Sequence, residues 1–279
     1  MTRGRVAGAL GVLLLFALFL ALRFPTDAVV RRLLAQDIPP GWPVLVFEHA
    51  ALRPNGIHLE AVTLRTPAGA ALLTADRMRL RPSLRSLLGG GAGHPWTVVG
   101  DLCGGYGQAV ITDDGPGAAV AVDWRDVDLA GCPRLRLAGG TLEAGRADGA
   151  ARLRIAPPAQ PEGSGTLALR QALWQGAGRL AALGALHADA ASLRWRLGDG
   201  RLTIEGLDLR GPEVSAAGDG SVALGDPPAA SALDLTLGVT QAPGAPGRIR
   251  FLFGLDGNPT ATRHLTITGT LGAPVVRME

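Results

Sequence analysis

The residues of this chain that could perform metal or nucleophilic chemistry are few and scattered. The histidines are His49, His58, His94, His187 and His264. They share no metal-ligand spacing, and neither an H-E-x-x-H nor a G-x-S-x-G motif occurs. Asp113-Asp114-Gly115 lacks the spacing and the distal Glu of a calcium loop and is typical of a turn. The sequence therefore predicts a protein without catalytic residues, metal ions or cofactors.

The two cysteines, Cys103 and Cys132, are the remaining reactive side chains. Neither stands in a C-x-x-C motif, which disfavours a zinc or redox site. A disulfide between them would close a loop of about 30 residues and stabilise the fold by ~3–4 kcal/mol in the chain-entropy model. It would also require an oxidising compartment. Two buried thiols are the alternative, and both interpretations stay open at this point.

Composition argues against nucleic acid as a partner. The net charge is +3, and all 27 basic residues are arginine, distributed along the chain among 24 acidic ones. A nucleic-acid groove needs clustered positive charge and aromatic stacking platforms, whereas aromatic residues make up only 4% of this chain. The 40 glycines and 20 prolines accompany 47% hydrophobic residues, which favours many short strands joined by tight turns over disorder.

One uninterrupted apolar stretch, Val6 to Leu22, predicts a membrane anchor. Its seventeen residues would reach about 26 Å as a helix, close to the ~30 Å hydrocarbon core of a bilayer. The stretch is longer than the apolar core of a signal peptide, and no A-x-A precedes the break at Arg23 to Pro25. We expect an uncleaved anchor, with a cleaved signal peptide and a buried core helix as the alternatives.

The arginines that flank this stretch nearly balance, so the positive-inside rule leaves the orientation open. Arg3 and Arg5 precede it, and Arg23 follows it. The segment from Phe24 to Gln36 has the apolar spacing of a short amphipathic helix and carries Arg31 and Arg32. Arg23, Arg31 and Arg32 are therefore candidate contacts to the membrane surface; a plain connector is the alternative for this helix.

From Val44 onward the apolar residues recur with the period of two that indicates strands. We expect about 14–18 short strands in a largely antiparallel, twisted sheet. Residues 82–88 are the one other helix candidate, and the Pro-rich residues 157–163 are the best candidate linker, dividing the domain into halves at 44–156 and 163–279.

A hairpin at residues 193–205 has the clearest sequence signature. Asp199-Gly200 fits a two-residue type I′ turn. That register pairs Trp195 with Ile204 on an apolar face and Arg194 with Glu205 on the opposite face. The alternation of apolar and polar residues then shifts by one position at Gly206, which predicts a β-bulge.

Several strand-and-turn motifs resemble one known family. They are F-P-x-x-x-V-x-R-x-L at 24–33, L-R-P-N-G-I-x-L-x-x-V-x-L at 52–64, L-R-S-L-L-G at 84–89, G-x-G-x-L-x-L at 163–169, D-G-R-L-x-I-x-x-L-x-L-x-G-P at 199–212, G-D-G-S-V-A-L at 218–224 and L-T-I-T-G-T-L-G-A-P at 265–274. The chain resembles the N proteins of the bacterial type II secretion system in their anchored periplasmic form. That family is similar in turn to the AsmA-like envelope proteins.

The resemblance implies a non-catalytic component of the inner-membrane secretion machinery. Residues 1–23 would form the cytoplasmic tip and anchor, residues 24–43 a juxtamembrane helix and linker, and residues 44–279 a β-rich periplasmic domain. The partners would be the inner membrane and other secretion components. The AsmA-like relatives imply an alternative, a curved sheet or half-barrel that binds or transfers phospholipid. An open apolar face would favour lipid binding, and a closed core with polar faces would favour the secretion component.

Overall fold

A computed structural model describes residues 44–53, 55–65, 69, 71–82, 96–113, 117–132, 135–137, 140–156, 159–176, 184–226, 228–241, 245, 247 and 262–278. The predicted anchor, the segment 24–36 with Arg31 and Arg32, Arg23 and residues 83–88 of the second helix candidate lie outside the described residues. Among the described residues, no helix has the length and hydropathy needed to cross a bilayer.

Sixteen strands form one sheet. They are β1 (Val44–Val46), β2 (His49–Arg53), β3 (Gly56–Arg65), β4 (Ala71–Pro82), β5 (Trp96–Leu102), β6 (Gly105–Asp113), β7 (Ala118–Asp128), β8 (Leu135–Leu137), β9 (Gly140–Ile155), β10 (Glu162–Gly176), β11 (Ala185–Gly198), β12 (Arg201–Arg210), β13 (Val214–Ala223), β14 (Ala232–Gln241), β15 (Thr262–Thr270) and β16 (Ala273–Met278). The short 3-10 helix η2 spans Pro228–Ala230. The expectation of a mostly β, antiparallel fold is confirmed.

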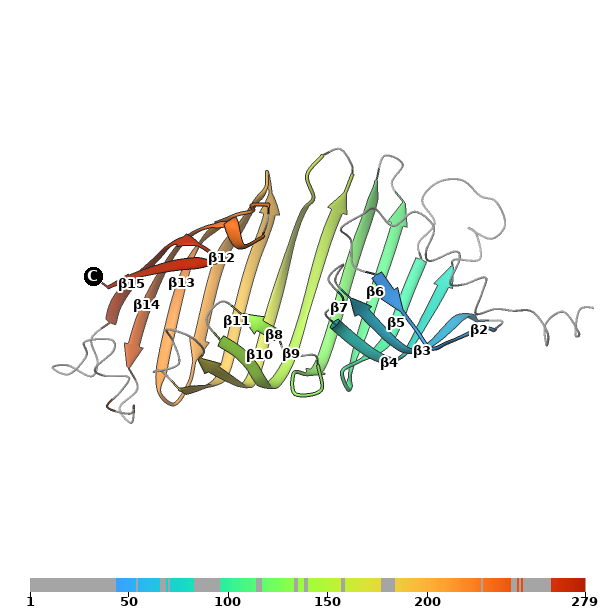
Figure 1. Ribbon diagram of the computed structural model, residues 1–279, viewed down its shortest axis with the longest axis horizontal. Helices are drawn as coiled ribbons and strands as arrows, with labels where there is room; N and C mark the ends of the chain where they lie inside the picture. Colours follow the sequence, from blue (N-terminus) through green and yellow to red (C-terminus); the bar gives the residue numbers. More distant parts are fainter. Residues whose placement is uncertain are drawn as a thin grey trace, which may run out of the picture.

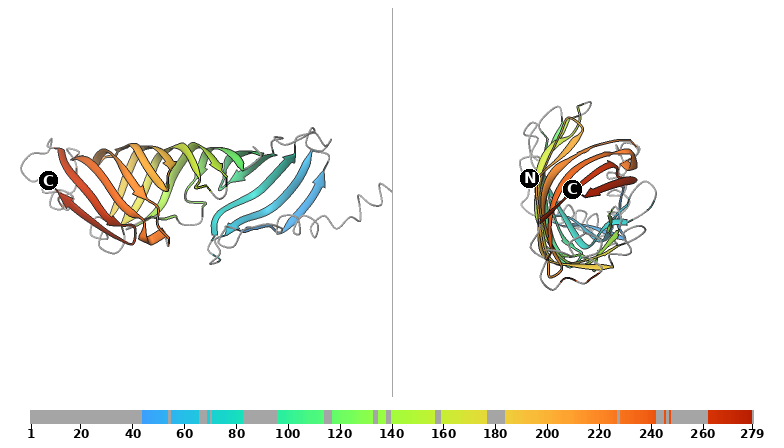
Figure 2. Two further views of the ribbon diagram at one scale, coloured as in Figure 1. Left: turned by 90° about the horizontal axis from the view of Figure 1, so that it is seen from above. Right: turned by 90° about the vertical axis from the view of Figure 1, so that its left-hand side faces the viewer.

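The strands follow one another across the sheet almost in chain order (Figure 1). Two short strands depart from that order: β2 continues the line of β1 along β3, and β8 continues the line of β7 along β9. Every pairing is antiparallel, as expected where tight turns join neighbouring strands. Seen along its long axis, the sheet is curved rather than flat (Figure 2).

The predicted hairpin is present as the β11–β12 turn. Asp199 and Gly200 have φ of 51° and 67°, as a type I′ turn requires, and Trp195 is opposite Ile204. The predicted pairing of Arg194 with Glu205 is wrong. Arg194 is opposite Gly206, because the predicted bulge already begins at Glu205, and Glu205 forms its ion pair with Arg196 at 2.9 Å.

The Pro-rich segment predicted as a linker connects two strands that pair with each other. β9 and β10 pair along most of their length, from the Arg154–Glu162 pair at one end to the Gly140–Gly176 pair at the other. The candidate boundary at 157–163 therefore falls at a turn within one sheet.

Bulges keep the apolar residues on one face along the longer strands. Asp126 on β7 and Gln171 on β10 adopt positive φ of 54° and 50°, and the register shifts at both positions. Each bulge inserts one residue, which reverses the alternation and bends the strand. These bends contribute to the curvature of the sheet.

Candidate functional site: an apolar face on an open sheet

The register places apolar residues opposite one another on strand after strand, on a surface that we call the apolar face. Four rows of directly opposed residues cross the sheet and contain only apolar residues and glycine. The first row is Trp96, Ile111, Val120, Leu153, Gly163, Leu197, Leu202, Val222, Leu233 and Gly269. The second is Val98, Ala109, Val122, Ala151, Gly165, Trp195, Ile204, Gly220, Leu235, Ile267 and Val276.

The other two rows lie beside these. The third is Gly100, Gly107, Trp124, Gly149, Leu167, Leu193, Leu207, Gly218, Leu237, Leu265 and Met278. The fourth is Val127, Ala147, Leu169, Ala191, Leu209, Ala216 and Val239. This row ends at β14, because Val239 is opposite Arg263 on β15. Opposed pairs of this kind contact each other directly, so the apolar face is continuous from β5 to β15.

Most of the apolar face is half-buried, whereas the opposite face is mostly exposed. Six side chains of the rows are buried: Val127, Ala147, Val222, Leu233, Val239 and Leu265. On β11, Leu193, Trp195 and Leu197 are half-buried, and Arg194 and Arg196 between them are exposed. No helix or second sheet among the described residues covers these side chains. Curvature explains the difference in exposure, because side chains on the inner side of a curved sheet converge and shield one another. We therefore assign the apolar face to the inner side of the curve (Figure 2).

Three tryptophans lie directly over glycines of neighbouring strands. A Cβ added to Gly149 would collide with the ring of Trp124, one on Gly165 with Trp195, and one on Gly140 with Trp174. An aromatic ring that covers a glycine in this way shields the backbone and fixes the strand register. The rings thus lie flat on the sheet and line the inner side of the curve without filling it.

On the opposite face, an ion cluster braces the bulge at Asp126. Arg170 donates from Nη2 to Asp148 Oδ2 at 2.8 Å and to Asp126 Oδ1 at 3.5 Å. Arg146 donates to the backbone and side-chain oxygens of Asp126 at 3.2 and 3.3 Å. The Asp126 backbone N–H donates to Asp148 Oδ1 at 2.9 Å. That hydrogen bond is the main reason why the pKa of Asp148 is lowered, and Arg170 adds to the effect. The cluster links β7, β9 and β10.

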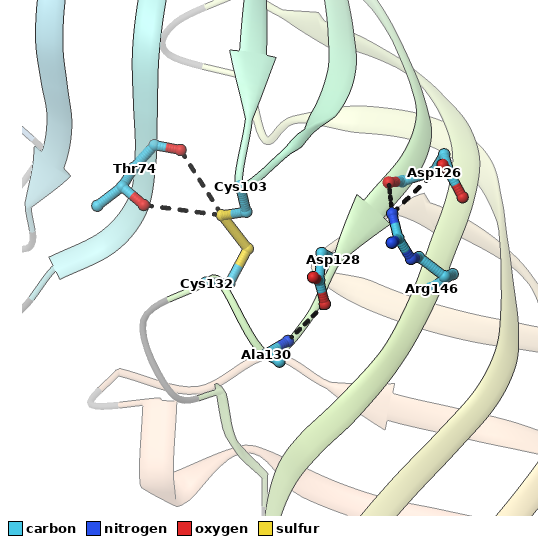
Figure 3. Close-up of a disulfide and its surroundings, with 7 residues drawn as sticks. All are labelled: Thr74, Cys103, Asp126, Asp128, Ala130, Cys132 and Arg146. Carbon is cyan, nitrogen blue, oxygen red and sulfur yellow. Dashed lines mark hydrogen bonds and ion pairs between the residues drawn. A yellow bond between two sulfur atoms is a disulfide. The ribbon is translucent and has the colours of Figure 1, made fainter.

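A disulfide joins Cys103 to Cys132 (Figure 3). It ties the turn between β5 and β6 to the segment that follows β7, and its Cα atoms lie 5.1 Å apart. Cys103 is buried, and its backbone N–H donates to the Thr74 carbonyl on β4 at 3.3 Å. A disulfide sulfur carries no proton, so the Thr74 hydroxyl, 3.7 Å away, is the donor to Cys103 Sγ. The disulfide therefore fastens two neighbouring turns beside β4.

Comparisons of this chain with protein-family models, with curated proteins and with solved structures find no match.

The histidines of the described chain do not converge. On β3, His58 Nε2 donates to Asn55 Oδ1 at 2.8 Å. On the distant strand β11, His187 Nδ1 lies 3.1 Å from Glu213 Oε1. Within the described residues, no group of three His, Cys, Asp or Glu side chains could hold a metal ion.

The pattern of Trp over Gly was not predicted from the sequence. Glycines at positions such as 163 and 165 occupy the apolar phase of β10, where a large side chain would be expected. That anomaly was the available signal, but the tryptophan that covers each glycine belongs to another strand and is known only from the register.

Proposed function

We propose that this protein binds the acyl chains of lipids along the apolar face. The observation that carries the proposal is the set of four apolar rows, which no helix or second sheet of the described residues covers. Among these residues, the segment after β7 covers only the part of the face around Val127 and Ala147. Apolar surface left in water costs about 25 cal/mol per Å², and monomers rarely expose apolar patches beyond a few hundred Å². An acyl chain placed along the rows would remove that cost.

The dimensions of the sheet suit an extended ligand. Fourteen strands lie on the main path of the sheet, which at about 4.8 Å per strand gives a length of about 60 Å. This is about twice the ~30 Å hydrocarbon core of a bilayer. From β5 to β14 the rows present only apolar side chains and glycine, and the fourth row is followed on β15 by Arg263. The ligand class we propose is thus defined by its apolar chains.

The remaining parts of the proposal concern place and family. We place the sheet in the periplasm, tethered to the inner membrane by residues 6–22, in the manner of the AsmA-like envelope proteins. The disulfide supports this placement, because such bonds persist in oxidising compartments. The curvature of the sheet agrees with an AsmA-like half-barrel (Figure 2).

Photocrosslinking at two adjacent residues of β11 tests the proposal. Benzoylphenylalanine replaces either Leu193, half-buried on the apolar face, or Ser192, exposed on the opposite face. The full chain is irradiated in cells, and adducts are identified by mass spectrometry. We expect phospholipid adducts at position 193 and none at position 192. Equal lipid labelling of the two positions, or no lipid adduct at position 193, would refute lipid binding by this face.

A second candidate function, a component of the type II secretion system, is supported by the last strand. β16 pairs on one side with β15 and forms the end of the sheet among the described residues. All its residues are exposed, including Val275, Val276 and Met278. Such an edge can accept a strand from a partner protein. Deletion of the gene distinguishes the two functions: lost exoprotein secretion with an intact lipid barrier supports the secretion component, and the reverse supports lipid binding.

A further inference from the structure

A cluster of arginines lies near the beginning of the sheet, on the face opposite to the apolar one. Gly56 on β3 is the register partner of Arg53 on β2, and a Cβ at Gly56 would lie 3.3 Å from Cγ of Arg81 on β4. In the adjacent row, His58 is opposite Arg79. Arg53 and Arg81 therefore stand on either side of a position without a side chain, with Arg79 beside them.

The depression at this cluster has a volume of about 440 Å³. Arg53, His58 and Arg79 line it, and Glu60, Arg77 and Asp101 lie at its far side. Arg81 is not part of the lining. Arg77 is neutralised by Asp101, whose Oδ2 lies 3.4 Å from the Arg77 Nε. Positive charge is therefore concentrated at the end of the depression nearer to Gly56.

The charges of the three arginines are not compensated. Among the described residues, Arg53, Arg79 and Arg81 form no ion pair, although arginines elsewhere on this face do so. The Nε of Arg79 is buried and has no hydrogen-bond partner within the described part of the chain. Buried donors of this kind are uncommon and call for an explanation, such as a bound ion.

The pKa of His58 reflects both its partial burial and the positive charge of the cluster. Its pKa is lowered from the ordinary value, first by desolvation and then by repulsion from Arg79, Arg53 and Arg81; Glu60 acts in the opposite direction. Its Nε2 donates to Asn55 Oδ1. The site thus presents arginines from β2 and β4 on either side of β3, and the Glu60 carboxylate lies in the following row together with Arg77.

We propose that Arg53 and Arg79 bind a phosphate group in the depression, with Arg81 adding positive charge beside Gly56. Guanidinium groups carry their donors in a planar fork that matches phosphate oxygens, and hydrogen bonds between charged groups are about twice as strong as neutral ones. The site and the apolar face lie on opposite sides of the sheet, so this proposal is independent of acyl-chain binding.

Two sources of phosphate share this chemistry, the headgroup of a membrane lipid and free phosphate. Calorimetric titration of the full chain in neutral detergent separates them. The probes are inorganic phosphate and dihexanoyl phosphatidylglycerol, and a glutamate-rich peptide represents a protein partner. Tighter binding of the lipid than of phosphate indicates a headgroup site, and the reverse order indicates free phosphate.

The variant that tests the site is Arg53→Gln combined with Arg79→Gln. We expect it to weaken binding of the phosphate probes at least tenfold. The matched control, Arg277→Gln, removes an exposed arginine at the far end of the sheet and should bind as the unaltered chain does. Arg53→Gln alone, at an exposed position of a short strand, provides a second variant that preserves the fold. Equal binding by control and test variants, binding of the peptide alone, or no binding of any probe would overturn the proposal.

Discussion

Two regions of this sheet use the same alternation of residues but cover their apolar face to different extents. In the first strands, Leu59, Val62 and Phe47 are only 0, 2 and 3% exposed. In the middle of the sheet, residues of the four rows such as Leu193 and Leu167 remain half-buried. Strand patterning alone therefore does not close a core.

The difference lies in the chain that crosses the face. The short strands β1 and β2 both pair with β3, and Phe47 lies in the break between them. Its side chain packs in the buried cluster that contains Leu59 and Val62. In the middle of the described sheet, the segment after β7 supplies Leu129, which forms a buried cluster with Val127, and Trp124 packs against that cluster. Leu193 on β11 lies outside this cluster. We infer that the first region supplies stability and that the middle region retains an apolar surface for a ligand.

The largest expected effect comes from removing the best-buried side chain of the first region. Leu59→Ala should lower the free energy of unfolding by about 3–5 kcal/mol, because it leaves a cavity in a closed cluster. The matched variant Leu193→Ala should lower it by less than about 1 kcal/mol, because a half-buried side chain loses less contact. Urea unfolding of the full chain, followed by circular dichroism, measures both. Equal losses would contradict the contrast between the regions.

A smaller effect is expected at the disulfide, which lies where the two regions meet. Replacing both Cys103 and Cys132 by serine should reduce the free energy of unfolding by about 3 kcal/mol, because the loop between them is no longer constrained in the unfolded chain. The measurement is the shift of the urea midpoint relative to the oxidised protein. Reduction of the unaltered chain should reproduce the shift, and reductant should leave the serine variant unaffected.

The flat tryptophans of the middle region allow a sharper test. Gly165→Val should cost about 1–3 kcal/mol by overpacking, because the new side chain occupies the space of the Trp195 ring. It should also reduce lipid crosslinking at position 193. Thr166→Val, on the exposed face of the same strand, is the control and should leave crosslinking unchanged. Unaltered crosslinking in Gly165→Val would argue against the tryptophan-lined surface as the lipid site.

The smallest effect concerns the ion cluster behind the middle region. Folding lowers the pKa of Asp148, so its contribution to stability is present above the unfolded value of about 3.9 and is lost as pH falls through the folded value. Partly exposed ion pairs contribute about 0–1 kcal/mol. The unaltered protein should lose stability below pH ~4 as Asp148 is protonated. In Asp148→Asn this part of the loss should be absent, so the total loss should be slightly smaller. Asp234→Asn, a change at an exposed carboxylate on β14, should not reduce the loss. Acid titrations of stability compare the two variants.

Local features of this sheet were predictable from the sequence, whereas features that depend on register were not. The Asp199-Gly200 turn and the bulge at Gly206 follow from turn chemistry and from the slip in apolar phase. The partner of Arg194 was predicted wrongly, because the bulge begins one residue earlier than the slip indicates. Three other features bring residues of separate strands together. They are the packing of Phe47 over the apolar face, the tryptophan rings over glycines, and the arginines beside Gly56. Alternation within a single strand contains no information about those contacts.

The near-sequential order of the strands makes the length of this protein adjustable. Each strand pairs mainly with its neighbours in the chain, so a hairpin could be added or removed without changing the partners of distant strands. Each added hairpin would extend the sheet by about 10 Å. The number of hairpins therefore sets how far the apolar face extends from β1, and that length can change by simple duplication of a turn and two strands.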